Sequence, residues 1–353
     1  MISIGLTVVA TLHLLAVYVA MTGPLVCLWL QRRAARDELA ARLDRYLLWL
    51  AVAALPIAAA LGGVAILLIS QLFPDAYLAA VRVLPKSRYW PYGAIELVFS
   101  LLCFLAAALL PAVSRWRGVV RWLATLFGST NLVYHFPALF VMLGVLSTRR
   151  TAWGQSIKFT VLLGDAEIGA RIVHHLLAAL AVGGVAIAWY GLRRSADAAR
   201  ADVARADTAR SIAWGSRIAT AAVLGQVFTG LWLIVVIPEG SRNALSGGDG
   251  LAAASLGGAL LLTFFVLPRL AAAAWGQVEH HAMYRTVLLV LAIVALMTAT
   301  RHRTRSLLLS SISTAQRQVF EQPTEPYRAA KTGLSGPILC ARRSAFSGSV
   351  SRS

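Results

Sequence analysis

Cysteine and charge are both scarce in this chain of 353 residues. It has three cysteines, and no CxxC or CxxCH motif occurs, with Cys27 and Cys103 inside apolar runs and Cys340 near the end of the sequence. A disulfide framework, a zinc site and covalently attached c-type heme are therefore not supported. Charged residues make up 14% of the chain, against about 25% in soluble domains, which argues against a soluble protein.

The charge that is present is strongly positive, with a net value of +18. The arginines lie mainly between apolar runs and near the C-terminus, and no basic stripe with interleaved aromatic residues occurs. Charged residues at the ends of apolar segments are what a membrane topology requires. We therefore predict lipid contact and no nucleic-acid partner.

Long apolar runs decide the fold class. Apolar residues make up 58% of the chain, and the mean hydropathy is +0.70. Runs of about 18 or more apolar residues are typical of transmembrane helices. The pattern predicts an all-α polytopic membrane protein with eight spans, at about 4–30, 46–72, 91–114, 122–147, 168–192, 212–237, 251–268 and 283–300.

The loops between these spans alternate in charge. One set holds 15 Arg and Lys residues and consists of 32–45, 115–121, 193–210 and 269–285. The other set holds seven and consists of 73–90, 148–165 and 238–250. Basic loops stay in the cytoplasm, so we expect a bacterial inner-membrane protein with both termini outside. Three residues past the last span oppose this orientation, namely Arg301, Arg303 and Arg305.

An internal repeat is visible in the sequence. The tetrapeptide that begins at His13 recurs at His175, and after a one-residue slip Gly23 matches Gly184, as do the Arg pairs that follow each glycine. This pattern predicts two parallel four-helix halves, related by an axis along the membrane normal. We expect residues 1–150 and 151–302 to be the two halves, and the polar, Ser- and Arg-rich residues 303–353 to be a disordered tail.

Few ionisable residues fall inside the predicted spans, and such residues are costly there unless they serve a partner or a cavity. They are His13, Glu96, Arg171, His135, His174 and His175. Counted from the span ends, the four histidines and Glu96 lie in the same half of the membrane, opposite the basic loops.

Histidines gathered at one depth favour a bound cofactor. Heme b takes axial imidazoles from facing helices, and glycine-rich helix faces suit a flat ring. We expect the iron ligands to be His13, His135 and His175, with His174 as a substitute. The remaining members of the predicted cofactor site are Glu96 and Arg171, for protons or propionates, and Asn131, one turn before His135.

The stretch His13-Leu14-Leu15-Ala16, and likewise His175-Leu176-Leu177-Ala178 before a Gly-Gly pair, is similar to a pattern in several membrane families. It resembles the copper resistance protein D family, the four-helix protoporphyrinogen oxidases and, more loosely, the first helix of subunit I of bd-type quinol oxidases. The resemblance covers about 20 residues at each site. It implies heme b ligation by His13 and His175, or copper handling by the same residues.

These observations lead to one main hypothesis and two alternatives. The main hypothesis is a membrane-embedded b-type heme protein, an oxidoreductase that exchanges electrons between quinone and a redox partner near the outer face. The first alternative is a transporter for copper or another small solute, which parallel repeats and an intramembrane polar cluster also fit. The second is a membrane scaffold or sensor without a cofactor, in which the histidines hydrogen-bond between helices.

Overall fold

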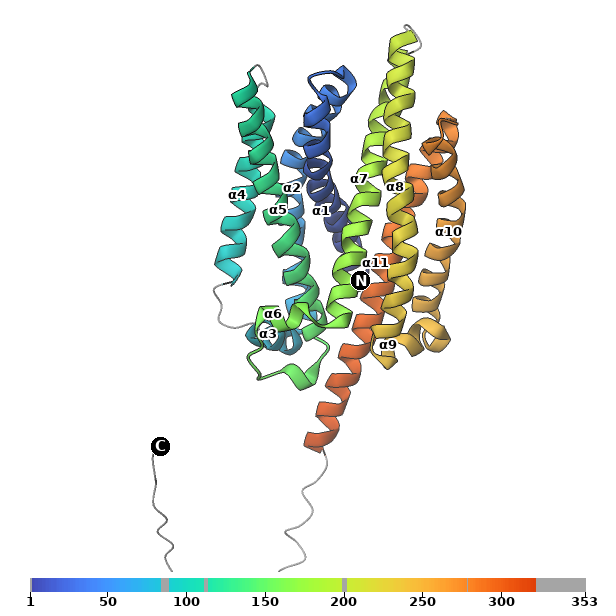
Figure 1. The fold of residues 1–353 in the computed structure, drawn as a ribbon. Coiled ribbons are helices and arrows are strands. Elements are labelled where there is room, and N and C mark those ends of the chain that lie inside the picture. Colours follow the sequence, from blue (N-terminus) through green and yellow to red (C-terminus); the bar gives the residue numbers. More distant parts are fainter. Residues whose placement is uncertain (1, 84–88, 111–113, 199–201, 278, 322–353) are drawn as a thin grey trace, which may run out of the picture. The chain divides into compact units, whose positions relative to one another are not determined.

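The protein is all-helical throughout the part that the structure, a computed structural model, describes: residues 2–83, 89–110, 114–198, 202–277 and 279–321 (Figure 1). Met1–Ile312 form one compact unit, and Ser313–Ser353 form a second. No strand occurs in the described residues.

Seven helices of the described chain are long and apolar enough to cross a membrane. They are α1 (Ile2–Arg33), α2 (Glu38–Leu72), α5 (Arg115–Leu146), α7 (Ala166–Ala198), α8 (Asp202–Val236), α10 (Gly250–Ala274) and α11 (His280–Glu321). The predicted span 91–114 coincides with α4 (Tyr89–Leu109), whose apolar stretch Gly93–Leu109 is shorter. The multi-pass membrane class is thus confirmed, and a count of eight spans stays a prediction.

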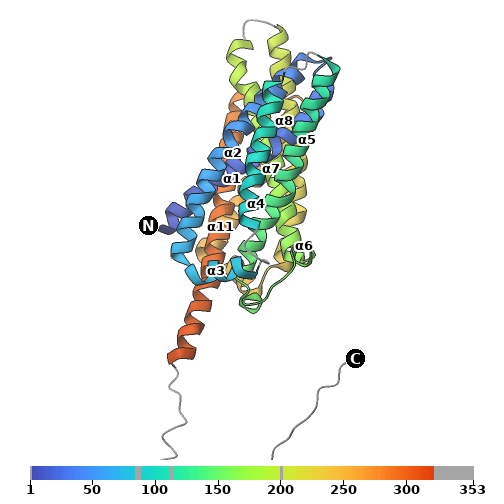
Figure 2. The same cartoon turned by 90° about the vertical axis from the view of Figure 1, so that its left-hand side faces the viewer.

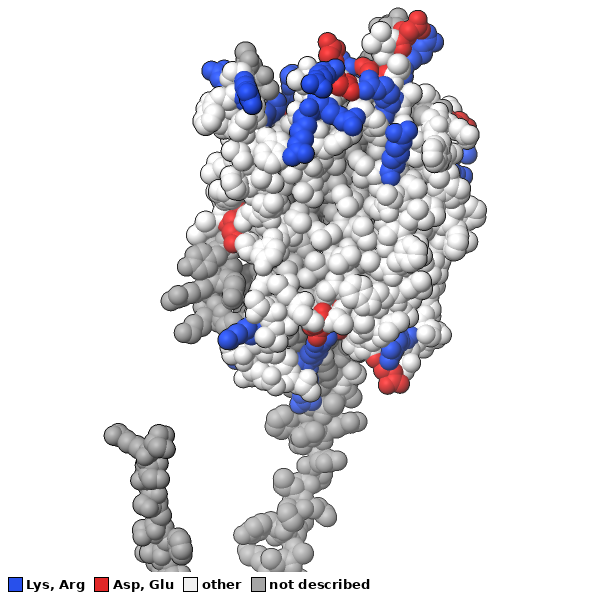
Figure 3. Space-filling view, in the orientation of Figure 1, with Lys and Arg blue, Asp and Glu red and all other residues white. Residues whose placement is uncertain are grey.

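The turns that join these helices lie at two opposite ends of the first unit. The last turns of α1, α4, α7 and α10 and the first turns of α2, α5, α8 and α11 lie at the upper end in Figure 1. The short helices α3 (Pro74–Val83), α6 (Phe159–Leu163) and α9 (Glu239–Asn243) lie at the lower end. Lys and Arg gather at the upper end of the face in Figure 3, above a band almost without charge. The basic loops therefore share one end, as the alternation predicts; which side of the membrane it faces stays a prediction.

Two helical hairpins make up the centre of the bundle. In them α1 packs along α2 and α7 packs along α8, while α1 also packs against α7. The α4–α5 pair lies on one side and α10 on the other (Figures 1 and 2). A Cβ on Gly183 would lie 2.1 Å from the Thr22 side chain, and one on Gly184 would lie 2.5 Å from the Gly215 carbonyl oxygen. Glycine is thus what lets α7 approach both α1 and α8, as is common where membrane helices meet.

The long helices begin at side chains that cap them. Asp37 accepts hydrogen bonds from the first amides of α2, Ser114 from that of Arg117 in α5, and Asp249 from that of Ala252 in α10. Each cap satisfies amide donors that have no partner within the helix. Polar capping residues therefore mark the points where the chain re-enters an apolar segment.

Large apolar side chains cover the outside of the bundle. Ile57, Val98, Phe228, Leu231 and Phe264 are all more than half exposed. Such an outer surface would be costly in water and is what contact with lipid requires. The helices therefore contact a lipid bilayer.

Buried ion pairs tie the helix ends together at both ends of the bundle. At the upper end, Asp44 of α2 pairs with Arg121 of α5 and also accepts a hydrogen bond from Gln31 Nε2 of α1 at 3.1 Å. The Asp44 side chain is 1% exposed and that of Arg121 is 12% exposed, so this pair is almost completely removed from solvent.

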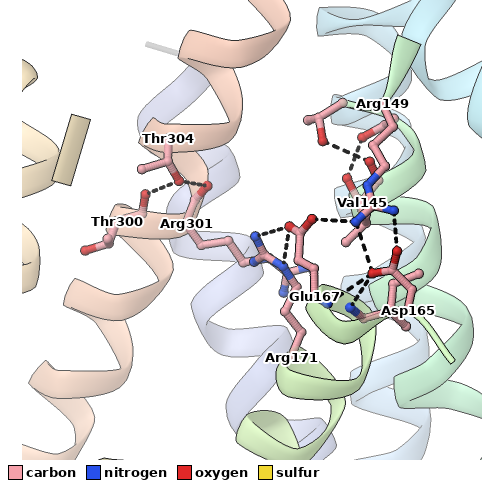
Figure 4. A network of polar contacts seen from close by, with 12 residues as sticks. Val145, Arg149, Asp165, Glu167, Arg171, Thr300, Arg301 and Thr304 are labelled. Carbon is pink, nitrogen blue, oxygen red and sulfur yellow. Dashed lines mark hydrogen bonds and ion pairs between the residues drawn. The ribbon is translucent and has the colours of Figure 1, made fainter. Parts of the chain in front are cut away.

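At the lower end, the buried Glu167 carboxylate accepts from Arg149 at 2.9 Å and from Arg171 at 2.7 Å (Figure 4). Arg149 also bonds Asp165 with both terminal nitrogens, at 2.5 and 3.0 Å. These hydrogen bonds from the Arg149 guanidinium hold the pKa of the Asp165 carboxyl below its usual value. The cluster joins the end of α5 to the start of α7.

The predicted disordered tail is wrong for residues 303–321, which continue α11 as helix. The physical reason is that the first turns beyond the apolar core still contact the bundle. Arg303 pairs with Asp249 at 2.8 Å, and Leu309 is buried. The prediction for 322–353 falls outside the described residues.

Candidate functional site

A cavity of about 430 Å³ lies among α1, α2, α4, α5 and α11, with one wall residue each from α3 and α7. Its volume falls within the range of ligand pockets, roughly 300–1,000 Å³. The lining is mostly apolar, with Leu, Ala, Val, Ile and Phe side chains from α1, α2, α4 and α5, whereas α11 contributes only polar side chains. The polar exceptions are His13, Tyr18, Tyr77, His175, Thr298, Arg301, His302 and Arg305.

A backbone carbonyl of α2 holds the His13 side chain in place. Its Nδ1 lies 2.8 Å from the carbonyl oxygen of Ala58, and because a carbonyl can only accept, Nδ1 carries the proton and donates. The ring fits there because Gly62 has no side chain: a Cβ on Gly62 would lie 2.8 Å from His13 Cε1. Nε2 is left with its lone pair, which is the tautomer that a metal-binding histidine adopts when its other nitrogen donates to a carbonyl.

His175 uses both ring nitrogens in contacts with other helices. Nε2 lies 3.1 Å from Arg301 Nη1 on α11, and Nδ1 lies 2.6 Å from the Tyr18 hydroxyl on α1. Because the guanidinium can only donate, Nε2 accepts, and in the neutral ring Nδ1 then donates to the Tyr18 oxygen. The Tyr18 hydroxyl proton is thereby left for another acceptor. Iron ligation by His175 would require Arg301 to move away.

His135 lies apart from the cavity, although its neighbour Phe136 lines it. His135 Nδ1 lies 3.3 Å from the Glu96 carboxylate and 3.4 Å from Asn131 Oδ1, and its side chain is 40% exposed. Asn131 Nδ2 in turn donates to the Glu96 carbonyl at 2.9 Å. Three of the predicted site residues are thus brought together, but none of them lines the cavity that holds His13.

His174 and Arg171 face other partners on α7 and α8. His174 Nδ1 lies 3.2 Å from the Thr229 hydroxyl of α8, and Arg171 pairs with Glu167. Neither residue lines the cavity. The predicted cluster at one depth is therefore divided, with His13 and His175 in the cavity, Glu96, His135 and Asn131 at α4–α5, and His174 and Arg171 along α7.

The contacts also bear on the register of the repeat. His13 bonds its hairpin partner α2, and the residue that bonds the corresponding partner α8 is His174. An offset of 161 residues pairs His13 with His174 and Gly23 with Gly184 without any slip. In each hairpin a histidine thus contacts the partner helix, whereas the repeat and its division into four-helix halves stay predictions.

Sequence reasoning missed the cationic part of the cavity. Thr298, Arg301 and Arg305 follow one another at helical spacing and all line the cavity. The helical spacing of these three residues is visible in the sequence. It lies at the end of the apolar run, however, and residues beyond 302 were assigned to the tail. The helix does not end there, so these side chains reach the bundle interior.

Comparison with known proteins adds no family to this picture. No protein-family model matches the chain, and no curated protein matches it. Among the described residues, no three His, Cys, Asp or Glu side chains converge in a way that could hold a metal ion by themselves. A metal bound to these residues would therefore need further ligands, as iron has in a porphyrin.

Proposed function

We propose that the chain is a bacterial inner-membrane protein that binds heme b in this cavity and passes electrons between quinone and a partner near the outer face. The observation that carries the proposal is His13, which lines an apolar cavity within the bundle with Nδ1 donating to Ala58 and Nε2 left to bind. Heme iron takes a proximal histidine of this kind. When bound, heme supplies a one-electron redox centre.

The residues around the cavity fit the other parts of such a molecule. Leu55, Leu97, Leu132 and Phe136 line it with apolar surface, which excludes water from a porphyrin ring. Arg301 and Arg305 line the α11 side of the cavity. Their guanidinium groups are the side-chain donors that match carboxylates, such as the two of heme, best. In this assignment His13 is the iron ligand, and His175 is a positioning residue that orients Arg301.

Tyr18 supports a role for quinone. Its side chain is buried and lines the cavity, and its oxygen accepts from His175, so its own O–H can donate to a quinone carbonyl oxygen. Replacing Tyr18 with Phe removes this donor while keeping the ring. We expect quinol oxidation by the Tyr18→Phe protein to show a raised KM, with any heme spectrum unchanged.

The decisive experiment is an absorption spectrum of the purified full chain, reduced minus oxidised, with extraction of any bound heme. We expect a Soret and an α-band change, and we expect His13→Ala to lose both. His281→Ala is the matched control, because His281 is exposed in the first turn of α11, at the opposite end of the bundle, and does not line the cavity.

Three results would count against the proposal. A wild-type protein that neither contains heme nor takes it up on addition would end it. Equal heme content in the His13→Ala and wild-type proteins would remove His13 as the ligand. A His13→Ala protein that loses only stability, from a wild type without any cofactor, would favour a scaffold role.

A further inference from the structure

The α11 side of the cavity carries two arginines, together with Thr298 and His302. Arg301 and Arg305 are one turn apart, so they project from the same face of α11, and both line the cavity. Figure 4 shows Arg301 reaching from α11 toward the side of the bundle that holds Arg171. Two guanidinium groups concentrate positive charge at one side of a pocket whose other walls are mostly apolar.

No carboxylate of the described residues pairs with either arginine. Two acidic groups at this end of the bundle already pair with other arginines, Glu167 with Arg149 and Arg171, and Asp249 with Arg303. Arginine keeps its charge under all ordinary conditions. A charged group taken out of water without a counter-ion is costly, so the site calls for an anion from outside the protein.

The hydrogen bonds of the two guanidinium groups are also incomplete. Arg301 bonds His175 through Nη1, and Arg305 bonds the Ser147 hydroxyl through Nη2 at 2.9 Å. The Arg305 Nε is buried and has no hydrogen-bond partner. A buried donor without an acceptor costs free energy, which an entering oxygen atom would recover.

The backbone of α5 makes room for this arrangement. A Cβ on Gly144 would lie 3.2 Å from Arg301 Nη2, so glycine allows the guanidinium to lie against the helix. Gly144 itself lines the cavity. The arginine is therefore accommodated beside the pocket rather than directed away from it.

We propose that Arg301 and Arg305 bind the carboxylate of an amphipathic molecule whose apolar body fills the rest of the cavity. This rests on the proposed function only in that the two carboxylates of heme are one source of the ligand; a membrane fatty acid is the other. Arg303 is outside the site, because it pairs with Asp249 and does not line the cavity.

The test compares each acid with its ester, using the full chain in detergent. The probes are heme and heme dimethyl ester, and a fluorescent fatty acid and its methyl ester. We expect wild-type protein to bind at least one acid roughly tenfold or more tightly than the ester, because charge-assisted hydrogen bonds are the strong ones. Arg301→Gln and Arg305→Gln should each reduce this preference, and Arg303→Gln should retain it.

Thermal unfolding without ligand is a second measurement that guards against loss of folding. Removing an unpaired and partly buried charge should leave Arg305→Gln at least as stable as wild type, whereas added acid should stabilise only proteins that keep both arginines. A marked loss of stability in ligand-free Arg305→Gln would overturn the proposal in favour of a structural arginine.

The heme and fatty-acid measurements together distinguish a failure of the carboxylate site from a failure of heme binding. If heme and its ester bind equally well, and fatty acid and its ester do too, the carboxylate site is wrong while heme binding stands. If heme does not bind but the fatty acid binds through both arginines, the carboxylate site stands and the heme function is wrong.

Discussion

The buried pair between Asp44 and Arg121 offers a sharp test of what holds α2 against α5. Asp44→Asn keeps the size of the side chain but removes the negative charge, and leaves the Arg121 guanidinium, 12% exposed, without a counter-ion. Breaking a buried ion pair in this way costs about 3–5 kcal/mol. The buried Arg121 Nε already has no hydrogen-bond partner. The surroundings of Arg121 therefore have few acceptors that could replace the lost carboxylate.

Glu38→Gln is the matched control for this substitution. Glu38 pairs with Arg42 one turn along α2, but its side chain is 92% exposed and that of Arg42 is 39% exposed. Exposed pairs of this kind contribute about 0–1 kcal/mol. The free energy of unfolding would be measured for both variants by SDS titration in mixed micelles, followed by tryptophan fluorescence.

A second variant identifies the cause of the loss. Adding Arg121→Met to Asp44→Asn removes the stranded charge, so the double variant should recover much of the lost stability, as buried pairs replaced by apolar residues often do. The reasoning would be refuted if Asp44→Asn cost no more than Glu38→Gln, or if the double variant were less stable than Asp44→Asn alone.

Two further predictions concern helix packing and pH. Gly184→Ala places a Cβ 2.5 Å from the Gly215 carbonyl oxygen, which should cost about 1–3 kcal/mol, whereas Gly63→Ala, with nothing within 4 Å, should be neutral or slightly stabilising in the same unfolding assay. Asp165 has a lowered pKa because Arg149 donates hydrogen bonds to it, so its contribution to stability is present above the unfolded pKa and is lost as pH falls through the folded one. Asp165→Asn should therefore lower stability at neutral pH and flatten the acid limb of a stability–pH profile; a variant with the wild-type acid limb would contradict this.

Hydropathy was a reliable guide to the helices, because a chain in a bilayer must satisfy its backbone hydrogen bonds within each segment. Each predicted span coincides with a helix, and the basic turns share one end. The end of the last span was misplaced because Arg301 and Arg305 break the apolar run in the sequence. In the structure they face the cavity and not lipid.

The site itself was predicted only in part. Depth along a helix follows from counting residues, and it placed His13 and His175 at one level, where they do share a cavity. Counting does not say which way a side chain faces around the bundle. His135 was therefore grouped with His13 and His175, although it contacts Glu96 and does not line the cavity. The short helices at the lower end, five to ten residues long, were too short to be predicted from apolar runs.

The sequence by itself determined the membrane class, the positions of the helices and the end at which the basic turns gather, since all three follow from where apolar and charged residues stand along the chain. Only the tertiary structure decided what the polar residues within the helices do. Helix rotation and close approach at glycines set that outcome, and they directed His13 toward Ala58, His175 toward Tyr18 and Arg301, and His174 toward α8. These properties depend on side chains from several helices at once, which no single stretch of sequence encodes.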